Sequence, residues 1–164
     1  MNRSSRTVKL VEMALLVAII LILAFTPLGY IKTLGLEITL IVVPVTIGAI
    51  ILGPLGGAVL GAVFGITSFI QCFGMSPFGA VLLGINPFGT FVVCVVSRIL
   101  MGWLTGLIYK GLSKFPKMKN WKILIANLAG PILNTFFFMS TLVIFFFSSD
   151  YIQSLAGGLN PFRF

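Results

Sequence analysis

Residues 10–25, LVEMALLVAIILILAF, decide the fold class of this chain. The run holds one charged residue, Glu12, and with its flanks it predicts a helix at 8–25, long enough to cross the hydrocarbon core of a membrane. Three basic residues precede it: Arg3, Arg6 and Lys9. They resemble the start of a signal peptide, but the apolar run is long for one and no small-x-small cleavage site follows it. We therefore expect the first transmembrane helix here and no cleaved leader.

The composition of the whole chain points the same way. Hydrophobic residues make up 59% of the 164 residues, charged residues make up 9%, and the mean hydropathy is +1.16. A soluble domain of this length cannot bury so many apolar side chains. Further apolar runs predict helices at about 37–52, 58–73, 87–110 and 123–147. The predicted fold class is an all-α integral membrane protein: one membrane domain, residues 1–164, with a bundle of five visible transmembrane helices.

The net charge of +8 has two interpretations, nucleic-acid binding and membrane topology. The basic residues do not form the basic-aromatic stripe of a nucleic-acid binder. They gather before the first helix and in one loop, which holds Lys110, Lys114, Lys117, Lys119 and Lys122. Basic clusters flank the cytoplasmic ends of membrane helices. We expect a multi-pass protein of the plasma membrane with a cytoplasmic N-terminus, a cytoplasmic loop 110–122, and no nucleic-acid partner.

Glycine and proline mark the predicted boundaries. We expect turns at 26–36 and 53–57, a kink at Pro44, and an apolar but Gly- and Pro-rich stretch at 74–86. Glycines that are four residues apart lie on one face of a helix and let the backbone of another helix approach closely. This spacing favours helix packing within the bundle. The glycines are Gly53, Gly57, Gly61 and Gly65, with Gly102 and Gly106 repeating the spacing.

A polar residue followed by Pro-Phe occurs three times. The motifs are Ser76-Pro77-Phe78-Gly79, Asn86-Pro87-Phe88-Gly89 and Asn160-Pro161-Phe162-Arg163. In the predicted topology all three lie at the outer face. They are either structured loops over a binding site or ordinary helix boundaries. The second alternative follows from proline after a polar residue, which ends helices and shapes turns.

Residue types needed for catalysis are scarce. The chain has no histidine, and its acidic residues are Glu12, Glu37 and Asp150, each at a predicted membrane edge. No acid/base pair, metal-ligand cluster or phosphate-binding P-loop can be recognised. Cys72 and Cys94 lie in apolar segments and are expected to be small buried residues. We predict no enzyme, no catalytic residue, no metal and no cofactor.

Arg98 is the exception in this apolar chain. It follows Pro87, the expected outer end of its helix, by eleven residues, which is about 16 Å at the rise of an α-helix. A charge at that depth costs about 2.5–3.5 kcal/mol on insertion scales and needs a partner. The partner is either a ligand anion, which suits a guanidinium fork, or backbone carbonyls and water inside the bundle. We favour the ligand.

Further polar and aromatic residues are candidates for the same site. Asn134 is expected at a depth similar to that of Arg98, because their helices run antiparallel. The remaining candidates fall near the outer ends of helices: Gln71, Asn86, Thr90, Phe78 and Phe88. Each alone suits packing, but as a set they resemble a pocket with apolar walls and a few polar anchors.

At these residues the chain resembles the substrate-binding S component of an energy-coupling factor (ECF) transporter. Ala14-Leu15-Leu16-Val17-Ala18 matches the small-x-x-x-small motif with which S components dock on the coupling subunit. Three other segments are similar: Leu52-Gly53-Pro54-Leu55-Gly56, Ser97-Arg98-Ile99-Leu100-Met101-Gly102 and Gly130-Pro131-Ile132-Leu133-Asn134-Thr135. The Asn-Pro-Phe turn, Arg98 and Asn134-Thr135 look most like the pantothenate-type branch. S components have six helices, whereas five are visible here, so the sixth is expected to be missing.

The resemblance implies the function and the partners. An S component binds a small vitamin, here pantothenate, and docks through Ala14 and Ala18 on a membrane coupling subunit that works with two ATPase subunits. The absence of a P-loop agrees with that division of labour. The alternatives are an S component for folate or riboflavin, and a self-sufficient small carrier. The carrier would need a coupling residue or a continuous polar pore, and neither is visible in the sequence.

Overall fold

The computed structural model describes residues 3–26, 30–33, 36–115 and 121–146. The chain begins with α1 (Arg3–Phe25) and a hairpin of β1 (Tyr30–Thr33) and β2 (Leu36–Thr39). Helices follow: α2 (Val42–Ile51), α3 (Gly53–Gln71), α4 (Pro77–Ile85), α5 (Pro87–Phe91), the π-helical turn η2 (Val92–Val96), α6 (Ser97–Leu112) and α7 (Trp121–Phe146).

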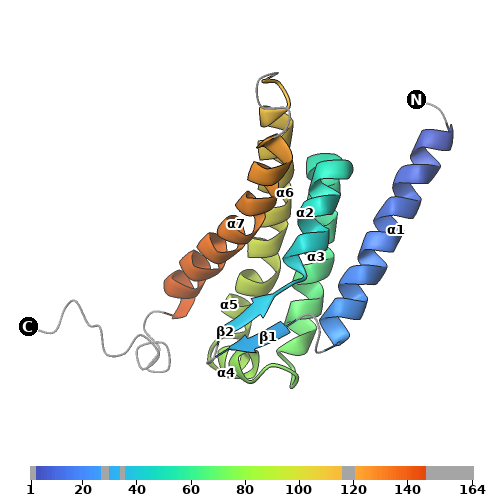
Figure 1. Cartoon of the computed structure of the whole chain (residues 1–164). Coiled ribbons are helices and arrows are strands. Elements are labelled where there is room, and N and C mark those ends of the chain that lie inside the picture. Colours follow the sequence, from blue (N-terminus) through green and yellow to red (C-terminus); the bar gives the residue numbers. More distant parts are fainter. Residues whose placement is uncertain (1–2, 27–29, 34–35, 116–120, 147–164) are drawn as a thin grey trace, which may run out of the picture.

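The long helices run side by side, so the described structure has two distinct ends (Figure 1). The start of α1, the α2–α3 junction, the end of α6 and the start of α7 lie at one end. The hairpin, α4, α5 and the end of α7 lie at the other. Lys9 and Lys110, one residue from each predicted basic cluster, line the same groove at the first end. We call the first the basic end and the second the hairpin end.

Within the described residues, four helices are long and apolar enough to span a membrane: Ser5–Phe25, Gly53–Gln71, Pro87–Leu112 and Trp121–Phe146. This confirms an integral membrane protein built from helices. The remaining predicted helix, 37–52, is represented by α2, whose ten residues reach about 15 Å, half of the hydrocarbon thickness. The residues after Phe146 lie outside the described part of the chain.

The prediction for the second helix, 37–52, is wrong at its start. Glu37 lies in β2, opposite Lys32 of the antiparallel β1, and α2 begins only at Val42. Ile38 and Thr39, the second half of β2, are β-branched, which favours extended backbone over a helix. The predicted kink at Pro44 is wrong as well, because Pro44 lies in the first turn of α2. A missing N–H breaks no helical hydrogen bond there.

Two connections also differ from the predicted ones. The turn expected at 53–57 is much shorter, since α3 already begins at Gly53, where φ is +84° and a side chain would be strained. The stretch 74–86 contains a helix, α4. The Ser76 side chain caps it by accepting a hydrogen bond from the Gly79 N–H at 3.3 Å, and Pro77 occupies its first position.

The glycines bring α3 and α6 into backbone contact, as their spacing predicts. A Cβ atom added to Gly57 would overlap the carbonyl oxygen of Gly102, and the reverse also holds. A Cβ atom added to Gly61 would overlap the carbonyl oxygen of Arg98. This contact is the most extensive one between two helices of the described structure. It fixes how residues of α3 and α6 face each other.

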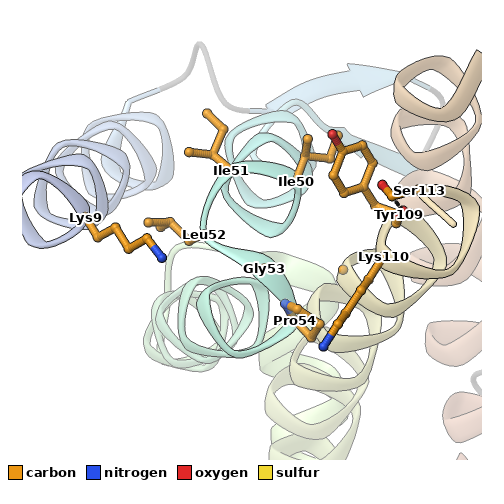
Figure 2. Close-up of a pocket in the computed structure, with 10 residues that line it drawn as sticks. Lys9, Ile50, Ile51, Leu52, Gly53, Pro54, Tyr109, Lys110 and Ser113 are labelled. Carbon is orange, nitrogen blue, oxygen red and sulfur yellow. Dashed lines mark hydrogen bonds between the residues drawn. The ribbon is translucent and has the colours of Figure 1, made fainter. Parts of the chain in front are cut away.

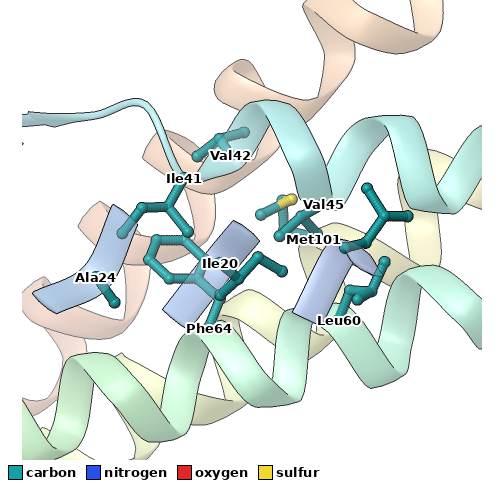
Figure 3. Close-up of a cluster of buried hydrophobic side chains, with 9 residues drawn as sticks. Ile20, Ala24, Ile41, Val42, Val45, Leu60, Phe64 and Met101 are labelled. Carbon is teal, nitrogen blue, oxygen red and sulfur yellow. The ribbon is translucent and has the colours of Figure 1, made fainter. Parts of the chain in front are cut away.

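The largest cluster of buried apolar side chains lies between α1, α2, α3 and α6 (Figure 3). Its members are Leu16, Ile20, Ala24, Ile41, Val42, Val45, Leu60, Phe64 and Met101. Helix α1 contributes only one stripe, at intervals of four residues, and lies on the outside of the bundle against α2 and α3. Within a membrane such a cluster stabilises the bundle by close packing of side chains rather than by removing apolar surface from water.

We predict that Gly61→Ala lowers the midpoint of thermal unfolding in detergent. The methyl group must push α6 away from α3, and such overpacking costs about 1–3 kcal/mol. Gly111→Ala is the matched control, since Gly111 lies near the end of α6 and a Cβ atom there meets open space. Equal midpoints for the two variants would contradict the backbone contact between α3 and α6.

Candidate functional site

Arg98 lies inside the bundle, far from either end of its membrane span. It belongs to the first turn of α6, and α5, η2 and α6 together form the span Pro87–Leu112. Its side chain is only 8% exposed. An ionisable residue at such a depth is a functional-site hypothesis by default, because insertion of its charge is costly.

The π-helical turn η2 holds the guanidinium. Nη1 of Arg98 donates hydrogen bonds to the carbonyl oxygens of Val93, at 3.1 Å, and Cys94, at 3.2 Å. The side chain therefore folds back along its own helix toward the hairpin end. Single π-helical turns within α-helices are common at functional sites. These contacts match the second interpretation of the sequence, in which carbonyl groups partner the arginine.

Two aromatic rings flank the same guanidinium. Its Cζ lies 4.7 Å from the ring centroid of Phe64 on α3 and 5.7 Å from that of Phe138 on α7. Both distances suit cation–π attraction. Three membrane-spanning segments thus converge on Arg98: α3, the η2–α6 junction and α7.

The next turn of α3 adds a polar group that the sequence analysis missed. Ser68 follows Phe64 by four residues and therefore shares its face of the helix. Its side chain is 8% exposed, and its Oγ has no hydrogen-bond partner. The signal was available in the sequence, because Ser68 continues the series Gly61, Phe64 and Gly65, which faces η2 and α6.

One turn further, Cys72 faces η2. Its sulfur lies 3.7 Å from that of Cys94, and both cysteines are buried, as predicted.

Asn134 lies on α7, closer to the basic end than the ring of Phe138. A hydrogen bond of 3.1 Å between the hydroxyls of Ser97 and Thr141 fixes the register of α6 and α7. Asn134 precedes Thr141 by two turns, about 10 Å along the axis, and precedes Phe138 by one turn. Its Oδ1 is buried without a hydrogen-bond partner. In this register Phe138 is the α7 side chain that stacks on the guanidinium.

Three predicted polar residues make structural hydrogen bonds. Gln71 donates from Nε2 to the carbonyl oxygen of Ala24 and so ties α3 to the end of α1. Asn86 caps α5, with Oδ1 accepting from the Gly89 N–H at 3.1 Å, and Thr90 donates to the Asn86 carbonyl oxygen at 2.9 Å. The motifs at Ser76 and Asn86 therefore mark helix starts, which their side chains cap. The third motif, at Asn160, lies outside the described residues.

The predicted phenylalanines differ in their surroundings. The ring of Phe78, on α4, lies 6.5 Å from that of Phe138 and packs on a buried cluster. That cluster consists of Leu82, Val93, Leu142 and Phe146. Phe88 is 69% exposed, with its ring 6.4 Å from that of Phe145. Among the predicted site residues, Arg98 and Phe78 are thus linked through Phe138.

Ala14 and Ala18 are both exposed on α1. The buried stripe of that helix consists of Leu16, Ile20 and Ala24. The two alanines therefore lie on the side of α1 that the described bundle leaves uncovered.

A charged side chain buried in a helical membrane bundle is typical of membrane proteins that bind or move a solute. The chain matches the family model "ECF transporter, substrate-specific component" over residues 8–164, and it belongs to this family. It is thus a multi-pass membrane protein and the substrate-binding component of an ECF transporter. No curated protein matches the chain.

Proposed function

We propose that this S component captures pantothenate, or a closely similar small carboxylate, and delivers it for ATP-driven import. The observation that carries the proposal is Arg98, a buried cation in the middle of a membrane span, at a π-helical turn. A guanidinium recognises a carboxylate through two parallel N–H···O bonds. Since Phe64 and Phe138 flank it, a ligand would approach the edge that carries the N–H donors.

Two buried polar atoms, on the same helices as the rings that flank Arg98, suit the rest of such a ligand. The Ser68 hydroxyl and the Asn134 Oδ1 are buried without hydrogen-bond partners, which costs about 1–3 kcal/mol each. The hydroxyl and amide groups of pantothenate can donate to both, and the Asn134 side chain can also donate in return. The unliganded protein already bears the free-energy cost of leaving these two atoms without hydrogen bonds. A ligand that bonds to them removes this cost, which strengthens its binding.

The hairpin end provides a cover for this site. Phe78 on α4 and Phe138 on α7 pack together beside the guanidinium. The α4 and α5 segments, with Asn86, Thr90 and Phe88, then form the lid through which the ligand enters. Opening requires α4 to move and Phe78 to leave Phe138, while α3 and α6 stay fixed by their glycine contact.

Energy for import comes from partners. We propose that Ala14 and Ala18 dock on the membrane coupling subunit, which works with two ATPase subunits. Small side chains let a partner helix approach the backbone of α1 closely, and both alanines are exposed. The basic end then faces the cytoplasm and the hairpin end faces outside. Folate or riboflavin is the alternative substrate within the same class.

Arg98→Met keeps the length and apolar packing of the side chain but removes its charge. We expect the affinity for pantothenate, measured by calorimetry on the purified protein, to fall about 10- to 150-fold, as for the loss of one charge-assisted hydrogen bond. Arg6→Met is the control, because Arg6 is exposed. Unchanged affinity in a folded Arg98→Met variant would make the arginine structural. Binding of folate or riboflavin in place of pantothenate would leave the transporter class intact and remove the substrate assignment.

Bulky residues at the proposed docking face should block transport without weakening vitamin binding. We expect Ala14→Trp with Ala18→Trp to abolish vitamin uptake by cells while the isolated protein keeps its affinity. Ile132→Trp, at an exposed apolar position of α7, should leave both unchanged. Equal loss of binding and uptake in the double variant would mean that the two alanines serve only the folding of this chain.

The orientation can be tested by labelling intact cells with a membrane-impermeant maleimide. In a background with Cys72→Ala and Cys94→Ala, we expect Met75→Cys, exposed at the hairpin end, to be labelled from outside. Lys114→Cys, exposed at the basic end, and Lys117→Cys should react only after the cells are permeabilised. Labelling of Lys114→Cys or Lys117→Cys in intact cells would reverse the topology.

A further inference from the structure

A groove of about 340 Å³ lies at the basic end, away from Arg98 (Figure 2). It is formed where α2 turns into α3, between the start of α1 and the end of α6. Among the residues that line it are Lys9, Gly53, Pro54, Tyr109, Lys110 and Ser113.

The groove is suited to an anion. Lys9 of α1 and Lys110 of α6 lie on either side of the α2–α3 turn (Figure 2), and none of the lining residues is acidic. A third cation is near, since Nζ of Lys122 lies 5.4 Å from the centroid of the Tyr109 ring. The hydroxyl of Ser113, which donates to the carbonyl oxygen of Tyr109 at 2.8 Å, adds a polar group to the wall.

Helix α3 begins in this groove and adds to the positive potential. No side chain caps its N-terminus. The N–H groups of a first helical turn lack intrahelical acceptors and carry the positive end of the helix dipole. Gly53 and Pro54 at the start of α3 have no bulky polar side chain that would compete for this position.

Exposed apolar side chains adjoin the charged groove. Leu10 is 69% exposed, Ile51 53% and Leu55 77%. Residues of this kind, next to the end of a membrane helix, contact lipid acyl chains. A ligand with an anionic head and an apolar tail therefore matches both surfaces, whereas a small soluble anion matches only the lysines. Basic grooves between membrane helices are sites for anionic head groups.

We propose that this groove binds the phosphodiester head group of an anionic phospholipid. The phosphate lies between Lys9 and Lys110 at the start of α3, and the acyl chains follow the apolar surface around Leu55. Because Lys9 and Lys110 belong to helices at opposite edges of the groove, the lipid ties the loosely packed α1 to the rest of the bundle. The proposal does not depend on which vitamin the protein binds.

The test is a lipid titration of the purified full chain in neutral detergent, followed by native mass spectrometry. The probes are short-chain phosphatidylglycerol, phosphatidylcholine with the same acyl chains, and inorganic phosphate. We expect phosphatidylglycerol to bind best. In the Lys9→Gln, Lys110→Gln double variant its affinity should fall about 5- to 30-fold, as for two lysines near an anionic membrane surface.

The matched control is Arg6→Gln with Lys114→Gln. It removes the same number of positive charges from exposed residues at the same end, neither of which lines the groove. Less than a twofold change is expected, and Lys9→Arg with Lys110→Arg should keep wild-type affinity. Equal losses in both glutamine variants would show that only net charge matters, and equal binding of the two lipids would remove the site. Inorganic phosphate binding as tightly as phosphatidylglycerol would overturn the lipid assignment.

Discussion

α3 and α6 touch through their backbones, and the rest of the structure depends on that contact. At Gly57, Gly61 and Gly102 no side chain separates the two helices. The contact places Phe64 against the guanidinium of Arg98 and, two turns further, Cys72 against Cys94. Close approach of this kind is also the main source of stability between helices in lipid, where apolar side chains gain little by leaving the hydrocarbon. The same glycines therefore hold the bundle together and align the candidate site.

The surroundings of Arg98 explain how a charge can remain in the bundle before any ligand binds. Its insertion costs about 2.5–3.5 kcal/mol, and each charge-assisted hydrogen bond to a carbonyl returns about 1.5–3 kcal/mol. Each ring adds about 0.5–2 kcal/mol. Together the two hydrogen bonds and the two rings offset the insertion cost, so the arginine can remain in the bundle before a ligand binds. A ligand carboxylate can compete because it offers a charged acceptor, whereas the backbone carbonyls are neutral.

The two ends of the bundle differ in their chemistry. At the hairpin end, short helices are capped by Ser76 and Asn86, and Phe78 packs against Phe138, whose ring lies beside the arginine. At the basic end, an open groove is lined by lysines. Helix α1 reaches both ends, held by Gln71 at one and, in our proposal, by a lipid at the other. Such a loosely packed outer helix leaves its alanine face available to a partner.

The sequence by itself determined the membrane class, the main spanning helices, the glycine contact and the depth of Arg98. Each follows from the length of an apolar run or from spacing within one helix, which a single segment decides. The hairpin at Glu37, the position of Pro44 in the first turn of α2, and helix α4 were not predicted, because strongly apolar stretches give no periodic signal that separates strand from helix. Only the tertiary structure decided that Phe138 of α7 stacks on the guanidinium and that Lys9 and Lys110 line the same groove. These pairings depend on the register and rotation of one helix against another, and contacts between distant residues set both.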